Sequence, residues 1–301
     1  MRASVAMLSR AALLFGIGLP YILAVSLTYR SHVAFNENPS TLFQRPFQRV
    51  EFSATDGVPL VGWWIPAAAR PGTSPPTVLL CPGLSATKAT QLHLAVRLMQ
   101  AGYNIFIFDF RGHGESGGAL TSFGDLERRD VLGAVRWLQT AHPQACRKLV
   151  GLGVNTGAAA LIAAAADPGP QGQNIDAIAV YGTFDRLDST LATIAQNYIP
   201  PPLGWLVRHV GLPLASVQVG ADLSSFSPAN DVKALWPRPI FVVHGLNDEI
   251  ISFEHGQSLY DSAFQPKYDL WIGTGGHFEV IDNDAAAREV RRYFDGSAQI
   301  L

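Results

Sequence analysis

The sequence between residues 148 and 166 reads KLVGLGVNTGAAALIAAAA. Residues 148–152 form an apolar run typical of a buried strand, and residues 158–166 form an alanine-rich run typical of a helix. Gly153-Val154-Asn155-Thr156-Gly157 joins the two runs. A sharp turn from strand to helix leaves no room for side chains two residues on either side of its centre, which explains both glycines. Asn155 tolerates the positive φ that such a turn imposes better than most residues do.

The composition restricts the class of protein. The chain has 301 residues, enough for one large domain with a well-buried core. Its net charge is −2 and it contains no basic run, so no nucleic-acid partner is expected. The two cysteines, Cys81 and Cys146, form neither a disulfide framework nor a metal-ligand spacing.

The N-terminus predicts a signal anchor or a signal peptide within residues 1–30. An uncharged apolar run extends from Ala11 to Thr28, close to the minimum of about 17 residues that can span a bilayer. Arg2 and Arg10 precede the run and favour a cytoplasmic N-terminus. We expect a membrane-anchored protein whose domain lies outside the cytoplasm. Two alternatives are secretion after cleavage near Ala24-Val25-Ser26 and a buried helix of a soluble fold.

The rest of the chain predicts an α/β architecture. Residues 31–47 are expected to form a polar linker, and residues 48–301 a single domain in which short apolar runs alternate with amphipathic helices. Such alternation predicts a mostly parallel, eight-stranded sheet flanked by helices. Residues from about 184 to 235 break the pattern, and they predict either a cap-like insertion or a long helical connection. The eight expected strands are residues 48–54, 60–65, 77–81, 103–108, 148–152, 175–181, 239–244 and 268–272.

Four further motifs stand at the ends of expected strands. In chain order they are Cys81-Pro82-Gly83-Leu84, Asp109-Phe110-Arg111-Gly112-His113-Gly114-Glu115-Ser116, His244-Gly245-Leu246-Asn247-Asp248 and Gly275-Gly276-His277-Phe278. Together with the turn at Asn155, their order resembles that of the α/β-hydrolase superfamily, especially its acylglycerol lipase-like and serine aminopeptidase-like branches. The resemblance covers roughly residues 48–297.

The resemblance identifies the turn at Asn155 as a nucleophile elbow. In the family the centre of the elbow is a serine that attacks an acyl carbon, and Gly153 and Gly157 match the elbow glycines. Asn155 replaces that serine. A neutral carboxamide has no oxygen that a neighbouring base can activate, so Asn155 cannot act as the nucleophile.

The resemblance also implies the remaining site residues. Asp248 would be the acid that orients His277, and His277 would be the general base. The backbone N–H groups of Leu84 and Thr156 would form the oxyanion hole. His113 belongs to a glycine-rich turn beside the site, where we expect it to be structural. No metal or organic cofactor is implied, because hydrolases of this kind need only water.

Three classes of function stay open. The first is a membrane-tethered hydrolase of carboxylic esters, acylglycerols or small amides. Its nucleophile would be a water activated by His277, the side chain of Thr156, or an aspartate formed when Asn155 deamidates. The second is a non-catalytic protein that binds an acyl or small apolar ligand. The third is a scaffold in which the cap and the N-terminal helix serve an interaction.

Overall fold

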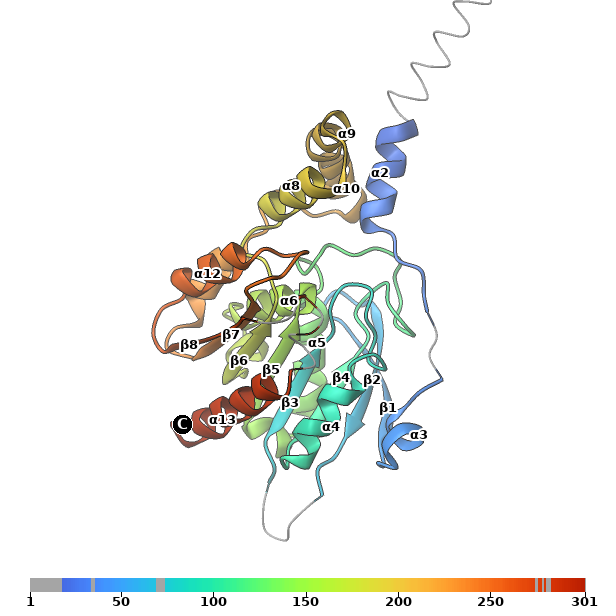
Figure 1. Ribbon diagram of the computed structural model, residues 1–301. Coiled ribbons are helices and arrows are strands. Elements are labelled where there is room, and N and C mark those ends of the chain that lie inside the picture. Colours follow the sequence, from blue (N-terminus) through green and yellow to red (C-terminus); the bar gives the residue numbers. More distant parts are fainter. Residues whose placement is uncertain are drawn as a thin grey trace, which may run out of the picture.

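The computed structural model describes residues 18–33, 36–68, 74–273, 276–277, 279 and 283–300. Its centre is one sheet with the strand order β1-β2-β4-β3-β5-β6-β7-β8 (Figure 1). β2 is antiparallel to both of its neighbours, and the other neighbouring pairs are parallel. The expected mostly parallel, eight-stranded sheet is confirmed. The strands are β1 (Gln48–Ser53), β2 (Pro59–Ile65), β3 (Thr77–Cys81), β4 (Asn104–Phe108), β5 (Leu149–Val154), β6 (Ala177–Tyr181), β7 (Ile240–Gly245) and β8 (Lys267–Ile272).

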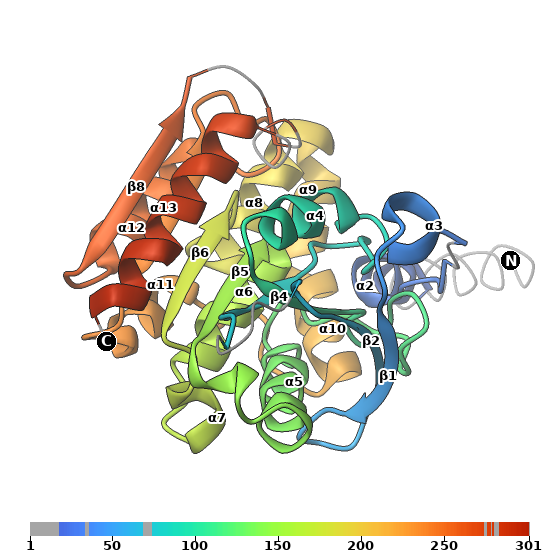
Figure 2. The same ribbon diagram turned by 90° about the horizontal axis from the view of Figure 1, so that it is seen from below.

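Helices cover both faces of the sheet. Successive residues of a strand point to opposite faces, and β3 shows the result: Leu79 and Cys81 join the core under α5 and α6, whereas Val78 and Leu80 join the core under α4 and α13. Figure 2 shows α4 and α5 on opposite sides of the sheet. The flanking helices are α4 (Leu92–Gln100), α5 (Arg128–Ala141), α6 (Thr156–Ala165), α12 (Phe253–Ser262) and α13 (Asp284–Ile300), with the shorter η2 (Ala145–Arg147), α7 (Pro170–Gln173), α11 (Pro228–Asp231) and η4 (Val232–Leu235).

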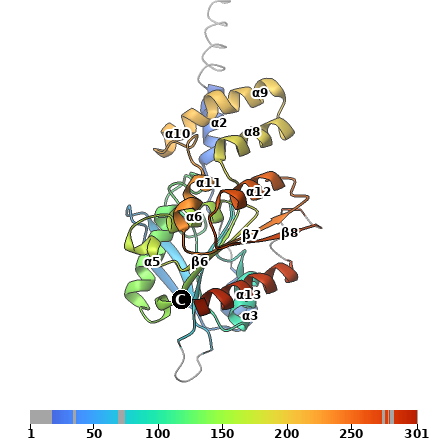
Figure 3. The ribbon, with the colours of Figure 1, turned by 90° about the vertical axis from the view of Figure 1, so that its left-hand side faces the viewer.

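The chain between β6 and β7 forms a separate helical layer. We call residues 187–219 of this segment the cap: α8 (Leu187–Tyr198), α9 (Pro201–Leu206), η3 (Val207–Gly211) and α10 (Leu212–Val219). The layer stands apart from the sheet together with α2 (Leu19–Thr28) in Figures 1 and 3. An apolar cluster joins the two parts, with Leu212 and Ala215 of α10 packed in the same cluster as Ala159 and Ala163 of α6. The segment expected as an insertion thus takes the cap-like form.

The expected membrane anchor is described only in part. Its last residues form α2, which is ten residues long. Within the described ranges, no helix has the length and apolar character needed to cross a bilayer. The earlier part of the expected anchor, residues 1–17, lies outside the described residues, so the anchor stays a prediction.

The expected linker contains a helix that the sequence interpretation missed. Within residues 31–47, one turn of helix forms α3 (Pro39–Phe43). The Asn38 side chain caps it by accepting hydrogen bonds from the N–H groups of Ser40 and Thr41, each at 3.0 Å, and the Thr41 hydroxyl accepts from the Asn38 N–H at 2.9 Å. This is a capping box followed by proline at the first helical position, a local signal that polar composition alone conceals.

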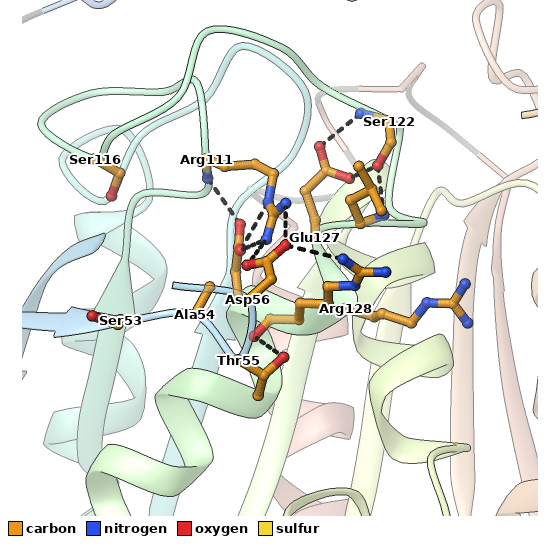
Figure 4. A network of polar contacts seen from close by, with 12 residues as sticks. Ser53, Ala54, Thr55, Asp56, Arg111, Ser116, Ser122, Glu127 and Arg128 are labelled. Carbon is orange, nitrogen blue, oxygen red and sulfur yellow. Dashed lines mark hydrogen bonds and ion pairs between the residues drawn. The ribbon is translucent and has the colours of Figure 1, made fainter. Parts of the chain in front are cut away.

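Arg111, in the turn after β4, ties three parts of the fold together. Its guanidinium donates to Asp130 of α5 at 2.6 and 2.9 Å and to Asp56 of the β1–β2 hairpin at 2.9 Å through two nitrogens. Figure 4 shows Arg111 and Asp56 side by side in this network. Burial alone would raise the pKa of Asp56, but the hydrogen bonds and charges of Arg111 and Arg129 outweigh it and lower that pKa.

We predict that Arg111→Ala lowers the free energy of unfolding by about 3–5 kcal/mol, because it leaves the fully buried Asp130 carboxyl, whose pKa burial raises to about 7, without its charge partner. Arg129→Ala is the matched control: Arg129 also pairs with Asp56, at 3.2 Å, but its side chain is exposed, so a loss below about 1 kcal/mol is expected. Urea unfolding of both variants measures the difference. Equal losses would show that Arg111 is not the clamp described here.

Candidate active site

The expected site residues meet at the carboxyl edge of the sheet. Asn155 follows β5, Asp248 follows β7 and His277 follows β8. The His277 Nδ1 lies 2.7 Å from Asp248 Oδ2, and the His277 Nε2 lies 2.8 Å from Asn155 Nδ2. This edge is where parallel α/β sheets place their ligands. The three side chains therefore have the arrangement of an acid, a base and an elbow residue, with a carboxamide in the third position.

The elbow has the strained backbone that its sequence predicts. Asn155 has φ 48° and ψ −119°, a conformation that costs a non-glycine residue about 1–3 kcal/mol. A Cβ on Gly157 would overlap the carbonyl oxygens of Cys81 and Pro82, and one on Gly153 would overlap the start of α6. Both glycines are thus required by close backbone approach.

The end of β6 holds the elbow in place. The Asn155 N–H donates to the Tyr181 carbonyl at 2.9 Å, and the Thr183 hydroxyl donates to the Asn155 carbonyl at 2.8 Å. These two bonds fix both backbone polar groups of the elbow residue, which supports its left-handed conformation.

Asp248 is a buried carboxylate with every oxygen engaged. Its Oδ1 accepts from the N–H groups of Ile250 and Ile251 at 2.9 and 2.8 Å, and its Oδ2 accepts from His277. Burial alone would raise the pKa of Asp248, but the hydrogen bond and charge of His277 and the two backbone donors outweigh it and lower that pKa. Asp248 Oδ2 accepts the proton on His277 Nδ1, and in this tautomer Nε2 presents a lone pair to Asn155.

The carboxamide of Asn155 makes two hydrogen bonds that agree on its orientation. Because the His277 Nε2 carries a lone pair, Asn155 Nδ2 donates to it, and Asn155 Oδ1 accepts from the Thr156 N–H at 2.6 Å. In the α/β-hydrolase arrangement, the histidine Nε2 would take the proton of the nucleophile, and the N–H at the position of Thr156 would stabilise the oxyanion. Asn155 therefore occupies the lone pair of the base and one of the two expected oxyanion donors.

The loop of the second expected oxyanion donor, Leu84, borders the elbow. A Cβ on Gly83 would lie 3.4 Å from the Asn155 Cβ. The next residue, Ser85, has a positive φ of 59°, and its N–H donates to His113 Nε2 at 3.2 Å. Among the described residues the Leu84 N–H has no hydrogen-bond acceptor. The loop thus presents an N–H beside the elbow.

His113 holds this loop, a role that the sequence interpretation assigned only in general terms. Its Nδ1 donates to the Arg111 carbonyl at 2.9 Å, so its Nε2 is free to accept from Ser85. Burial lowers the pKa of His113, which favours this neutral form. No sequence pattern indicates the contact, because Ser85 and His113 are 28 residues apart.

Gly182 is a site residue that the sequence interpretation missed. It follows β6 with φ 51°, and a Cβ there would lie 3.3 Å from the His277 Cε1 and 3.6 Å from Asp248 Oδ2. A side chain at this position would crowd both residues. The available signal in the sequence was a glycine directly after an apolar strand.

Two residues of the His277 motif, Gly275 and Phe278, lie outside the described residues. In the ranges that the structure describes, no three side chains of His, Cys, Asp or Glu are grouped to hold a metal ion.

We predict that Asp248→Asn destabilises the protein at pH 7 and that the loss shrinks as the pH falls below about 4. The lowered pKa of Asp248 means that its carboxylate stabilises the fold above the ordinary pKa of an aspartate, about 3.9, and that this contribution disappears as the folded protein takes up the proton. Urea unfolding across this pH range measures it, with the exposed Asp261→Asn as control. A pH-independent difference would contradict the assigned charge.

The comparisons with known proteins agree with this geometry. The family model described as "Serine aminopeptidase, S33" matches residues 73–235. Uncharacterized protein YfhR of Escherichia coli O157:H7 is 29% identical over 238 residues, covering 78% of this chain and 75% of YfhR. Uncharacterized protein Rv2307c of Mycobacterium tuberculosis is 26% identical over 245 residues, covering 81% of this chain and 77% of Rv2307c.

Solved structures show the same fold. Esterase Pf2001 of Pyrococcus furiosus superposes with a TM-score of 0.71 at 24% identity, over 89% of this chain and 98% of the esterase. Alpha/beta hydrolase GrgF of Penicillium sp. sh18 superposes with a TM-score of 0.65 at 19% identity, over 84% and 98%. The family match covers more than half of the chain and includes the elbow, and the sheet order and site geometry accord with it. The chain belongs to the serine aminopeptidase S33 family and has the α/β-hydrolase fold.

Proposed function

We propose that this protein is a non-catalytic member of its family, which binds an acyl or small apolar ligand at the elbow and does not hydrolyse it. The observation that carries the proposal is the pair of hydrogen bonds of Asn155. Its amide nitrogen donates to His277 and its amide oxygen accepts from the Thr156 N–H.

These two bonds oppose each step of ester hydrolysis. Asn155 has no hydroxyl to attack a carbonyl, and its amide proton is not transferable to a histidine at neutral pH. A water molecule would have to displace the amide before His277 could activate it. Loss of the nucleophile in a serine protease lowers kcat by about 10⁶. We expect a loss of similar size here, since Asn155 also covers an oxyanion donor.

Two features support ligand binding. The Leu84 loop offers a backbone N–H to a carbonyl oxygen. Beside it, Leu84 packs against the apolar cluster that lies between α6 and the cap and includes Phe184 and Ile251. A polar N–H next to apolar side chains suits a ligand with one carbonyl group and an apolar chain.

The competing function is hydrolysis by a water that His277 activates. The specific observation in its favour is the intact pair of Asp248 and His277, at 2.7 Å. The two functions differ in a measurable way, because only the second requires turnover by the unaltered chain.

We predict that the full-length protein hydrolyses p-nitrophenyl butyrate no faster than its His277→Ala variant. Asn155→Ser should gain activity, because it supplies the hydroxyl and frees the Thr156 N–H. The double variant Asn155→Ser, His277→Ala should lose that gain, which separates the restored base from a nonspecific effect. Initial rates at pH 7–8 for the four proteins give the comparison.

Binding of the same ester to the protein is measured separately. In the unaltered protein, saturation-transfer NMR should detect p-nitrophenyl butyrate without release of nitrophenolate, and Gly83→Val, which crowds the elbow, should weaken the signal. Turnover by the unaltered protein that disappears in His277→Ala would overturn the proposal in favour of water activation. Absence of both binding and turnover would also overturn it.

A further inference from the structure

The cap is unusually poor in charge. Residues 189–221 span 33 positions, and Arg208 is the single Lys, Arg, Asp or Glu among them, although charged residues make up 15% of the whole chain. Neither α2 nor α10 contains a charged residue. A helix that is apolar on all sides is normally buried on all sides, in a core or in a membrane.

These helices are nevertheless exposed on their outer sides. The exposed fraction is 80% for Val217 of α10 and 59% for Trp205 of α9. Tyr21 and Ile22 of α2 and Leu214 of α10 are exposed as well. We call these five residues the cap face: Tyr21, Ile22, Trp205, Leu214 and Val217.

The cap face is built from two segments that are far apart in the sequence but packed together. A Cβ on Gly211 of η3 would lie 3.6 Å from the Leu23 Cβ, and the Thr28 hydroxyl lies 3.3 Å from Gln218 Oε1. Figures 1 and 3 show α2 beside α9 and α10 at the end of the molecule remote from the sheet. Exposed apolar patches on a folded protein mark interaction sites.

We infer that the cap face docks on a lipid bilayer. In the sequence, α2 is preceded by residues 11–17, AALLFGI, which are apolar and uncharged. Tyr21 and Trp205 are amphipathic aromatic residues of the kind found at membrane–water interfaces. Arg208 and His209 are the only Lys, Arg, His, Asp or Glu residues between Asp188 and Asp222. A surface that binds a protein partner usually has a polar rim. The inference does not depend on whether the elbow is catalytic.

The test uses the tryptophans of the chain. Trp205 and Trp236 are the two exposed ones, at 59% and 66%, but Trp236 lies in the segment before β7, outside the cap. The full-length protein is bound to phosphatidylcholine–phosphatidylglycerol vesicles whose acyl chains carry bromine, a short-range quencher of tryptophan fluorescence. We expect quenching in the unaltered protein, loss of most of it in Trp205→Phe, and retention of it in the matched control Trp236→Phe.

The comparison separates docking of the cap from anchoring by residues 1–17, because the quencher reports only on a tryptophan that touches the acyl chains. Equal quenching in the two variants, or vesicle binding without quenching, would overturn the inference. Failure to bind vesicles would overturn it too. A concentration-dependent dimer in sedimentation that Val217→Glu abolishes, without vesicle binding, would replace the bilayer with a second copy of the chain.

Discussion

The site depends on one backbone constraint, the left-handed turn at Asn155 between β5 and α6. A φ of 48° aims the side chain outward from the sheet edge, and the turn brings the backbone of Gly157 against that of Cys81 and Pro82. The loop after β3 is therefore seated on the elbow, and the ends of β6, β7 and β8 are arranged around it. The strain of about 1–3 kcal/mol is offset by two hydrogen bonds: the Asn155 N–H donates to the carbonyl of Tyr181 in β6, and the Thr183 hydroxyl donates to the Asn155 carbonyl.

A carboxamide at position 155 makes the hydrogen bonds that the elbow offers, but it cannot act as a nucleophile. A serine hydroxyl would donate to the lone pair of His277 and leave the Thr156 N–H for a substrate. The planar amide of Asn155 carries a donor and an acceptor at fixed separation, so one rotamer serves both groups. An aspartate would not, because a carboxylate oxygen against His277 Nε2 would require a protonated imidazole. The amide thus suits the tautomer of His277 whose Nδ1 carries the proton toward Asp248.

How well the sequence predicts each feature of the site depends on how far apart in the sequence the interacting residues lie. The eight strands were predictable because buried parallel strands are short apolar runs. Asp248 and His277 were expected because their motifs resemble those of the α/β-hydrolase superfamily and stand at strand ends. The role of His113 was not, since its bond to Ser85 depends on two loops meeting in space. The hydrogen bonds of Asn155 also require the tautomer of His277, which Asp248 sets through the fold. Gly182 was missed because a glycine after a strand has many possible reasons.

The packing of the cap was likewise not predictable from the sequence. Its shortage of charge is visible in the sequence, but a charge-poor segment is equally compatible with a buried core. What distinguishes the two is the position of α2, which covers one side of η3 and α10 and leaves Trp205 and Val217 exposed. The polar residues of this region, such as Thr28 and Gln218, are directed to each other, so they do not cover the outer side. The apolar outer face is therefore a property of the tertiary contact between α2 and the cap, which neither segment has alone.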